Sequence, residues 1–278
     1  MGGRPRPCAP REPRLRRLIP ALWVLGSAGL VLATAPADAG AWPQDKGEGL
    51  LVITTLMDRA DQGFGPDGET VDDGYFYKDE TAAYLEYGLT ARTTWVSRVA
   101  WQSVERRQGS RVDAARGLSA SELALRHQVW SDGPDTLSFQ AGVLLPGSGE
   151  NVSNQPLGSG ETAWEARALW GRRLSPSQFA DVQLSHRWRG GEDLNEARLD
   201  LTWGWQPAER WQVLAQSFSV WSVEAARPGR PEFQQHKLQV SVGRQWGDVE
   251  YHLGIAATPA GRNVINERMA FLSVWRRF

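Results

Sequence analysis

The sequence predicts an all-β fold: an antiparallel up-and-down transmembrane β-barrel of twelve strands, preceded by a cleavable signal peptide. Three observations predict it: polar and apolar residues alternate along most of the chain, the connections are short and long in turn, and the amino terminus has the layout of an export signal. The alternation is clearest in residues 179–189, where one face would carry Asp181, Gln183, Ser185, Arg187 and Arg189, and the other Ala180, Val182, Leu184, His186 and Trp188.

Residues 1–39 are expected to be a signal peptide, which leaves residues 40–278 for the barrel. Six arginines come first, an apolar run from Leu18 to Leu32 follows, and small residues end the segment at Ala37 and Ala39, where we expect cleavage. The apolar run is shorter than the roughly 20 residues of a spanning helix. The single cysteine, Cys8, falls in this segment, so we expect no disulfide or thiol chemistry in the mature chain.

Twelve segments show the alternation, and most have the length of about 9 to 11 residues that a tilted membrane strand needs. In chain order they are residues 49–59, 74–88, 92–106, 118–131, 136–146, 162–173, 178–189, 195–206, 210–221, 235–246, 248–258 and 267–278. An even number of strands places both ends of the barrel on the same side of the membrane.

The connections between these strands form two alternating sets. Five are tight and rich in Gly, Pro, Asp and Ser, as β-turns require: residues 88–91, 132–135, 175–177, 207–209 and 247. The other set has long loops at residues 60–73, 107–117, 146–161, 222–234 and 258–266, and only 190–194 is short among them. Turns at one end and loops at the other are typical of outer-membrane barrels, with the turns in the periplasm.

One parity of each strand carries most of its polar and charged residues, which predicts the face that lines the lumen. A Lys or Arg facing lipid at the bilayer midplane would cost about 2 to 4 kcal/mol. The lumen-lining candidates are therefore Lys78, Glu80, Glu86, Arg98, Glu122, Arg126, Glu165, Arg167, Asp181, Arg187, Arg198, Asp200, Lys237 and Glu250. The lipid face should carry the opposite parity, as in Leu137, Phe139, Ala141, Val143 and Leu145, or Leu199, Leu201, Trp203 and Trp205.

A soluble β-sandwich would also alternate, since it has one buried and one wet face. Two observations weigh against it. Every strand keeps an apolar face with few charges, and the last strand ends on an aromatic residue, Phe278, which shares its parity with Ala270, Leu272 and Val274. A terminal aromatic residue on the lipid face is typical of the signal that outer-membrane assembly machinery recognises, although Arg276 departs from the usual pattern.

Composition excludes other classes of protein. Removing the six arginines and two acids of residues 1–39 from 31 basic and 32 acidic residues leaves 25 against 30, a net charge of −5. A nucleic-acid partner is therefore not expected. Of 14 tryptophans, all but Trp23 follow the signal segment, and tryptophan favours the membrane–water boundary.

Three segments resemble a family of outer-membrane β-barrels named after the meta-cleavage pathway of phenol degradation. They are Glu86–Thr90 (EYGLT) at the first tight turn, Ser121–Arg126 (SELALR) entering the second, and Gln140–Gly147 (QAGVLLPG) leaving it. The resemblance extends over much of the chain from Trp42 onward. It implies a barrel in the outer membrane of a Gram-negative bacterium and, through the family's name, the uptake of aromatic compounds; it implies no catalytic residue.

A barrel enzyme acting on envelope lipids would need a nucleophile and a base, and the mature chain offers His127, His186, His236 and His252 as bases. Ser185 and His186 are adjacent, so they should point to opposite faces. His127 could approach Ser97 across the third and fourth strands, but no carboxylate shares their face. We therefore expect no catalytic residue, cofactor or metal centre, and treat these histidines as residues of the barrel wall or the membrane interface.

The first long loop is acidic, with Asp61, Asp67, Glu69, Asp72 and Asp73. Their order lacks the spacing of a calcium-binding loop, so we interpret it as a solvated loop that at most binds divalent ions weakly, as a bridge to lipopolysaccharide. The partners expected are outer-membrane lipid and lipopolysaccharide, the barrel assembly machinery through the strand ending at Phe278, and a small solute.

The predicted function is passive permeation of small solutes by a monomeric barrel, with aromatic or hydrophobic solutes suggested by the resemblance. About nine residues precede the first strand in the mature chain, too few for a folded plug. Three alternatives stay open: the charged side chains neutralise each other and simply fill a narrow interior, the barrel is a lipid enzyme, or a closed barrel binds partners through its loops.

Overall fold

The computed structural model describes residues 40–147, 150–151, 161–191 and 193–278. Residues 1–39, with the expected signal peptide and Cys8, lie outside the described residues, as does most of the expected loop 146–161. None of the described residues forms a helix long and apolar enough to cross a membrane.

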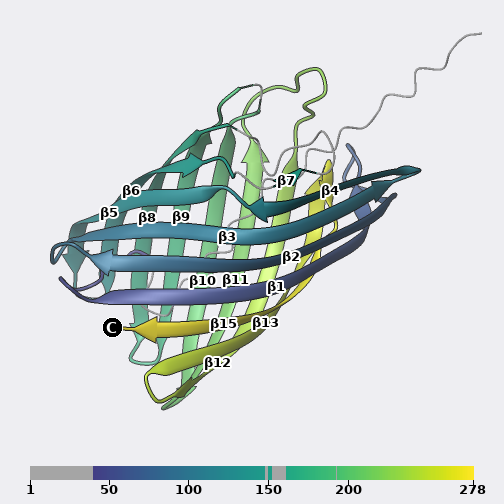
Figure 1. The fold of residues 1–278 in the computed structure, drawn as a ribbon. Coiled ribbons are helices and arrows are strands. Elements are labelled where there is room, and N and C mark those ends of the chain that lie inside the picture. Colours follow the sequence, from purple (N-terminus) through teal and green to yellow (C-terminus); the bar gives the residue numbers. More distant parts are fainter. Residues whose placement is uncertain (1–39, 148–149, 152–160, 192) are drawn as a thin grey trace, which may run out of the picture.

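The described strands form a closed antiparallel barrel with a wall of twelve strands, counting β4 and β5 as one, which confirms the predicted fold class (Figure 1). These strands are β1 (Gly49–Phe64), β2 (Thr70–Gly88), β3 (Thr93–Gln108), β4 (Arg111–Leu118) continued by β5 (Ser121–Asp132), β6 (Asp135–Leu145), β8 (Ala163–Ser175), β9 (Gln178–Trp188), β10 (Glu196–Ala208), β11 (Trp211–Ser222), β12 (Gln234–Trp246), β13 (Val249–Arg262) and β15 (Arg268–Arg277). Two short pieces, β7 (Glu150–Asn151) and β14 (Val264–Ile265), pair with β4 and β1 at the loop end.

The barrel closes where the last strand pairs with the first. Their ladder runs from Leu50 opposite Arg277 to Arg59 opposite Arg268. The backbone N–H of Gly49 donates to the carbonyl of Phe278 at 2.7 Å, and that of Phe278 donates back at 3.0 Å. Closure leaves no unpaired edge in the part of the wall that would cross lipid, which a transmembrane sheet requires.

Three of the expected long loops are wrong, because most of their residues continue the strands. β1 and β2 pair as far as Phe64 and Thr70, β3 and β4 form a hairpin that turns at Gly109, and β13 extends to Arg262. Outside the membrane both faces of a strand meet water, so the alternation that identified the strands stops while the backbone ladder continues. Loop 222–234 is an extended connection, as predicted.

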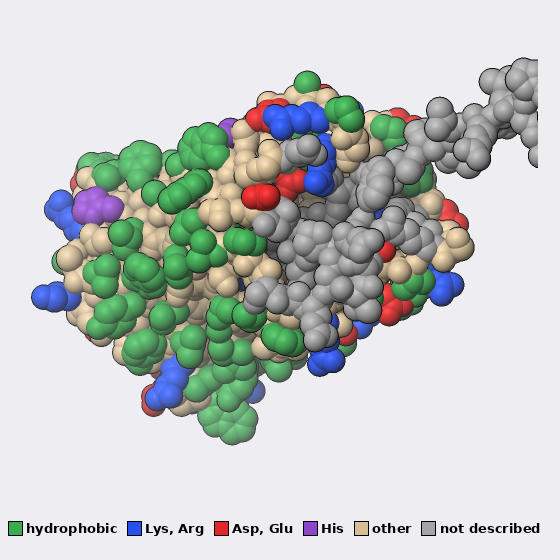
Figure 2. Space-filling view, turned by 45° about the horizontal axis from the view of Figure 1, so that its top comes forward, with side chains coloured by type: hydrophobic (Ala, Val, Ile, Leu, Met, Phe, Trp, Pro, Cys, Tyr) green, Lys and Arg blue, Asp and Glu red, His purple; other side chains and the backbone are tan. Residues whose placement is uncertain are grey.

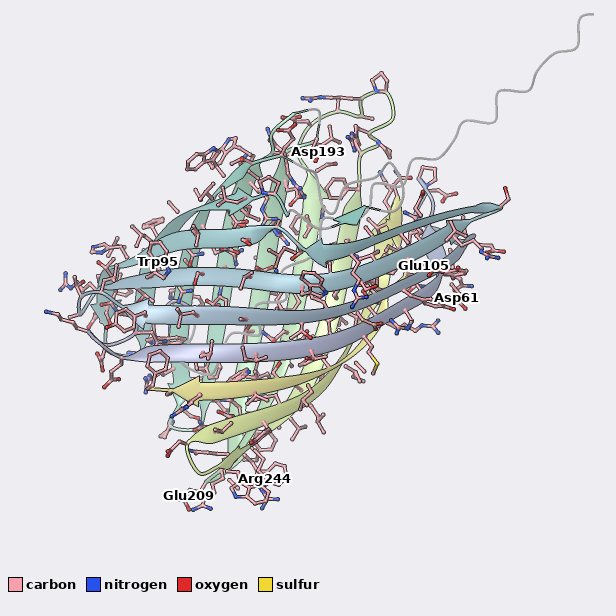
Figure 3. All side chains as sticks on the ribbon, viewed as in Figure 1. Asp61, Trp95, Glu105, Asp193, Glu209 and Arg244 are labelled. Carbon is pink, nitrogen blue, oxygen red and sulfur yellow. The ribbon has the colours of Figure 1, made fainter. Side chains whose placement is uncertain are left out.

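The outer surface carries an apolar band between charged rims. Figure 2 shows hydrophobic side chains covering the wall, and Figure 3 shows Asp61, Glu105 and Asp193 toward the loop end, with Glu209 and Arg244 at the turn end. Phe139, Leu201 and Trp203 are among the exposed residues of the predicted lipid face. Exposed tryptophans lie toward both ends: Trp130, Trp205, Trp211 and Trp246 at the turn end, Trp164 and Trp188 at the loop end. This is the pattern of aromatic girdles at the two membrane interfaces.

The segment that precedes β1 lies inside the barrel. Ala41 is fully buried, and its backbone N–H donates to the carboxylate of Asp181, a lumen-facing residue of β9. The segment is too short for a folded plug, as predicted, but it occupies part of the lumen.

Candidate functional site

The candidate site is the lumen, and the structure places all fourteen predicted lining residues on the inward parity of their strands. Eleven are buried, while Arg167, Asp200 and Glu250 are partly exposed. Their low exposure means that the interior is narrow in this structure, since side chains that lined a wide aqueous pore would be wet.

Ion pairs connect β8, β9 and β10 into one group, here called the arginine cluster: Glu165, Arg167, Arg187, Arg189, Glu196, Arg198 and Asp200. Glu165 accepts from Arg167 at 2.8 Å and from Arg187 at 2.7 Å. Arg167 also reaches Asp200 at 2.9 Å. Arg198 makes only a 3.6 Å contact with Glu196, and its Nε has no partner among the described residues. The cluster therefore carries four guanidinium groups against three carboxylates.

A second set of charges lies on the opposite wall. Glu80 of β2 pairs with Lys78 at 2.9 Å and with Arg98 of β3. Toward the turn end, Glu86 accepts from Arg126 at 2.9 Å and from the hydroxyl of Tyr84, which is buried beside it. Lys237 of β12 pairs at 2.6 Å with Glu267, just before β15. Each of these charges is therefore paired with a neighbour on the same or an adjacent strand.

The lumen also has an apolar side, which the parity argument missed. It consists of two groups along β1 and β15 and their neighbours: Ala60, Phe76 and Ile265 at the loop end, and Leu56, Ala256, Met269 and Phe271 nearer the turn end, with the buried Asp58 of β1 between the two groups. We call these residues the apolar stripe. Polar lumen residues such as Thr54 and Ser273 interrupt it, with a hydrogen bond of 2.7 Å between their hydroxyls. The sequence carries a signal for it, since Leu50, Val52 and Leu56 are apolar on the inward parity of β1 while Leu51, Ile53 and Met57 are apolar on the outward one.

At the turn end the apolar side becomes a ring. Buried apolar side chains from seven strands meet inside the barrel, with Trp42 of the amino-terminal segment packed against them. This ring, the turn-end collar, consists of Leu50, Val52, Tyr84, Val96, Ala124, Phe179, Leu214 and Trp275. Aromatic and aliphatic groups gathered at one end of a lumen form a constriction that water does not solvate well.

The histidines were only partly placed correctly. The register sets His127 opposite Thr93, whose hydroxyl lies 3.0 Å from Nδ1, so the predicted approach to Ser97 is wrong. His186 packs on Trp188 on the outer face, away from Ser185. His252 is buried on the lumen side of β13, on the same polar parity as Glu250, stacked on Trp275 and 2.9 Å from Glu250.

Sequence reasoning missed one hydroxyl–imidazole pair, Ser219 with His236, joined at 2.9 Å on the outer parity. Pairing of β11 with β12 creates it, and only the register reveals it. The Thr93–His127 pair has the same geometry elsewhere on the wall, so the arrangement arises from cross-strand packing as readily as from catalysis.

The acidic residues of segment 61–73 lie on the ends of β1 and β2 and in the tight connection of residues 65–69 between these strands. Asp67 accepts from the N–H of Glu69 in the connecting turn, and Asp72 accepts from that of Gly74 within β2, where the register with β1 is irregular, so both carboxylates stabilise the local backbone. Within the described part of the chain, no group of three His, Cys, Asp or Glu residues is placed to hold a metal ion.

Comparisons with known proteins place this barrel among outer-membrane barrels. No family model matches the sequence, and no curated protein does. Among solved structures, the COG4313 outer membrane channel from Pseudomonas putida F1 is similar, with a TM-score of 0.72 and 15% identity over 87% of this chain and 99% of that one. The translocator domain of the autotransporter NalP from Neisseria meningitidis has a TM-score of 0.52 at 11% identity, covering 84% and 90% of the chains. The KdgM porin in complex with oligogalacturonate has a TM-score of 0.51 at 9% identity, covering 82% and 99%. These similarities establish the fold.

Proposed function

We propose that this protein is a passive channel for small solutes in the outer membrane of a Gram-negative bacterium, and that it favours solutes with an aromatic or hydrophobic part. The observation that carries the proposal is the mixed lining of the lumen, in which the apolar stripe lies between the arginine cluster on one wall and the Glu80 and Glu86 ion pairs on the other. A general porin has a polar interior throughout. An inner apolar stripe gives a solute's apolar surface somewhere to bind.

The fold similarities support the proposal, since a COG4313 outer membrane channel and the KdgM porin share the architecture. The resemblance of residues 86–90, 121–126 and 140–147 to the phenol meta-pathway family points to the same class of solute.

The test compares aromatic and sugar flux through liposomes that contain the mature chain. Met269→Gln keeps the length of the side chain but makes the apolar stripe polar at a buried position. We expect the efflux of a small aromatic alcohol to fall severalfold while the efflux of a neutral sugar changes little. Met57→Gln is the matched control, because Met57 lies on the neighbouring strand but is 55% exposed on the outer face. Equal loss of both solutes in Met269→Gln, or the same loss in Met57→Gln, would refute a role for the stripe.

We also propose that the barrel assembly machinery recognises the last strand, and that outer-membrane lipid and lipopolysaccharide surround the wall. Leu272 and Phe278 are exposed on the outer face, and the ring of Phe278 lies over Gly49 where the barrel closes. Phe278→Ala should lower the amount of folded barrel in the outer membrane of an expressing cell, measured by its gel mobility without heating. Leu272→Ala is the control, and an equal yield of Phe278→Ala and wild type would contradict this proposal.

A further inference from the structure

Residues 40–46, here called the strap, run through the lumen at the turn end. At the far side, the Ala41 N–H donates to Asp181 Oδ2 at 2.9 Å, and the hydroxyl of Ser138 on β6 donates to the Ala41 carbonyl. Asp181 is 2% exposed and Ser138 is fully buried, so these anchors lie inside the barrel. Ser138 follows the turn at residues 133–134, and Asp181 follows the turn at residues 176–177. The strap therefore lies close to the turn end of the barrel.

At the near side, the strap is held by β2 and β3. The Gln44 N–H donates to Thr94 Oγ1 at 2.9 Å, and its side-chain amide donates to Glu86 at 2.8 Å. Seven residues of extended chain reach on the order of 20 Å. The strap therefore crosses from β6 and β9 to β2 and β3, with polar anchors at both ends.

Between these anchors, Trp42 fills the turn-end collar. Its ring meets Phe179 edge to face, with centroids 6.0 Å apart. The contact buries apolar surface of the Trp42 ring, and this burial stabilises the strap in the collar. No covalent bond joins Trp42 to the wall.

Glycines leave room for this arrangement. A Cβ at Gly171 would lie 2.6 Å from the ring of Trp42, and one at Gly204 would collide with Phe179. Gly40 has φ +110°, and a Cβ there would lie 2.5 Å from Asp181 Oδ2. The wall and the strap thus fit each other at three positions where only glycine has the space.

We propose that the strap is the specificity-determining constriction of the channel, with Trp42 as the group that limits the size of solutes passing the collar. This inference rests on the proposed channel function and adds to it the element that restricts flux. The strap is held by hydrogen bonds and apolar packing alone, so it can leave the collar while the barrel wall stays intact.

The first experiment compares single-channel conductance and the size limit for neutral sugars in three reconstituted mature chains: wild type, Trp42→Ala, and a chain lacking residues 40–46. Each must migrate as a folded barrel without heating. We expect a severalfold higher conductance and a larger size limit for both variants. Trp246→Ala, which removes an 80% exposed tryptophan at the same end, is the matched control and should behave like wild type.

The second experiment locks the strap. Residues 40–278 contain no cysteine, so Gly40→Cys with Asp181→Cys introduces the only pair. The close approach of position 40 to the Asp181 carboxylate brings the two Cβ atoms near disulfide range. We expect the disulfide to form in the folded barrel and to keep the conductance low. Reductant should raise the conductance severalfold, because the reduced variant has neither the disulfide nor the Asp181 carboxylate to hold the strap. Each single cysteine variant should show no effect of reductant.

The outcomes separate the two proposals. If wild type and the strap-deleted chain conduct equally with the same size limit, the strap is not the constriction, although the channel function stands. If the disulfide forms without lowering conductance, the docked strap is equally refuted. If both wild type and the deleted chain are silent, the channel function itself fails and this inference fails with it.

Discussion

At the residue scale, the charged side chains of the lumen are paired with one another, so a substitution that removes one charge leaves its partner unpaired. Glu165 is the clearest case, because Arg167 and Arg187 both donate to it and all three belong to the arginine cluster. Removing one member of a buried ion pair is costly, since the remaining charge keeps its desolvation penalty.

Glu165→Gln should therefore lower the free energy of unfolding by about 3 kcal/mol, the lower end of the cost for a buried pair, because water in the lumen can partly solvate the arginines. Asp79→Asn is the matched control: Asp79 pairs with Arg59 at 2.8 Å on the outside, where both side chains are largely exposed. It should cost less than about 1 kcal/mol. Urea titration of the barrel in lipid measures both, and equal effects would show that the cluster adds no stability.

At the scale of elements, the strands were predictable and their outer ends were not. The alternation of polar and apolar residues located every strand of the wall, including Leu137–Leu145 and Leu199–Trp205. Lipid on one face and the lumen on the other enforce this period of two. That period stops where the wall leaves the membrane, so residues 60–64 and the β3–β4 hairpin could not be recognised as strand. The strap could not be predicted because its residues show no periodicity. Its position depends on hydrogen bonds from Ala41 to Asp181, which is 140 residues away, and to Ser138, which is 97 residues away.

Orientation is the prediction that belongs to this scale. Gly109 and Gly133 both sit in tight turns with positive φ, the first at the loop end and the second at the turn end. A peptide tag inserted after Gly109 should bind antibody on intact cells, because outer-membrane barrels direct their loops outward. The same tag after Gly133 should be reached only after the outer membrane is permeabilised. The reverse pattern, or labelling of both tags on intact cells, would contradict the assigned orientation.

At the scale of the whole molecule, three features combine. The molecule has an apolar band outside, a lumen lined by ion pairs and an apolar stripe inside, and a strap across the turn end that is not part of the wall. The sequence predicted the wall and the charged lining by parity. It could not predict how much space the paired side chains leave, since that depends on three-dimensional packing, nor the apolar stripe, which brings together residues of β1, β13 and β15.

Planar-bilayer recording on the purified mature protein tests the central claim most directly. If the lumen is a solute pathway, insertion of the folded barrel should produce discrete conductance steps, small in the wild type and larger once residues 40–46 are removed. A folded barrel that inserts and stays electrically silent in both forms, at every voltage and salt concentration, would contradict the account.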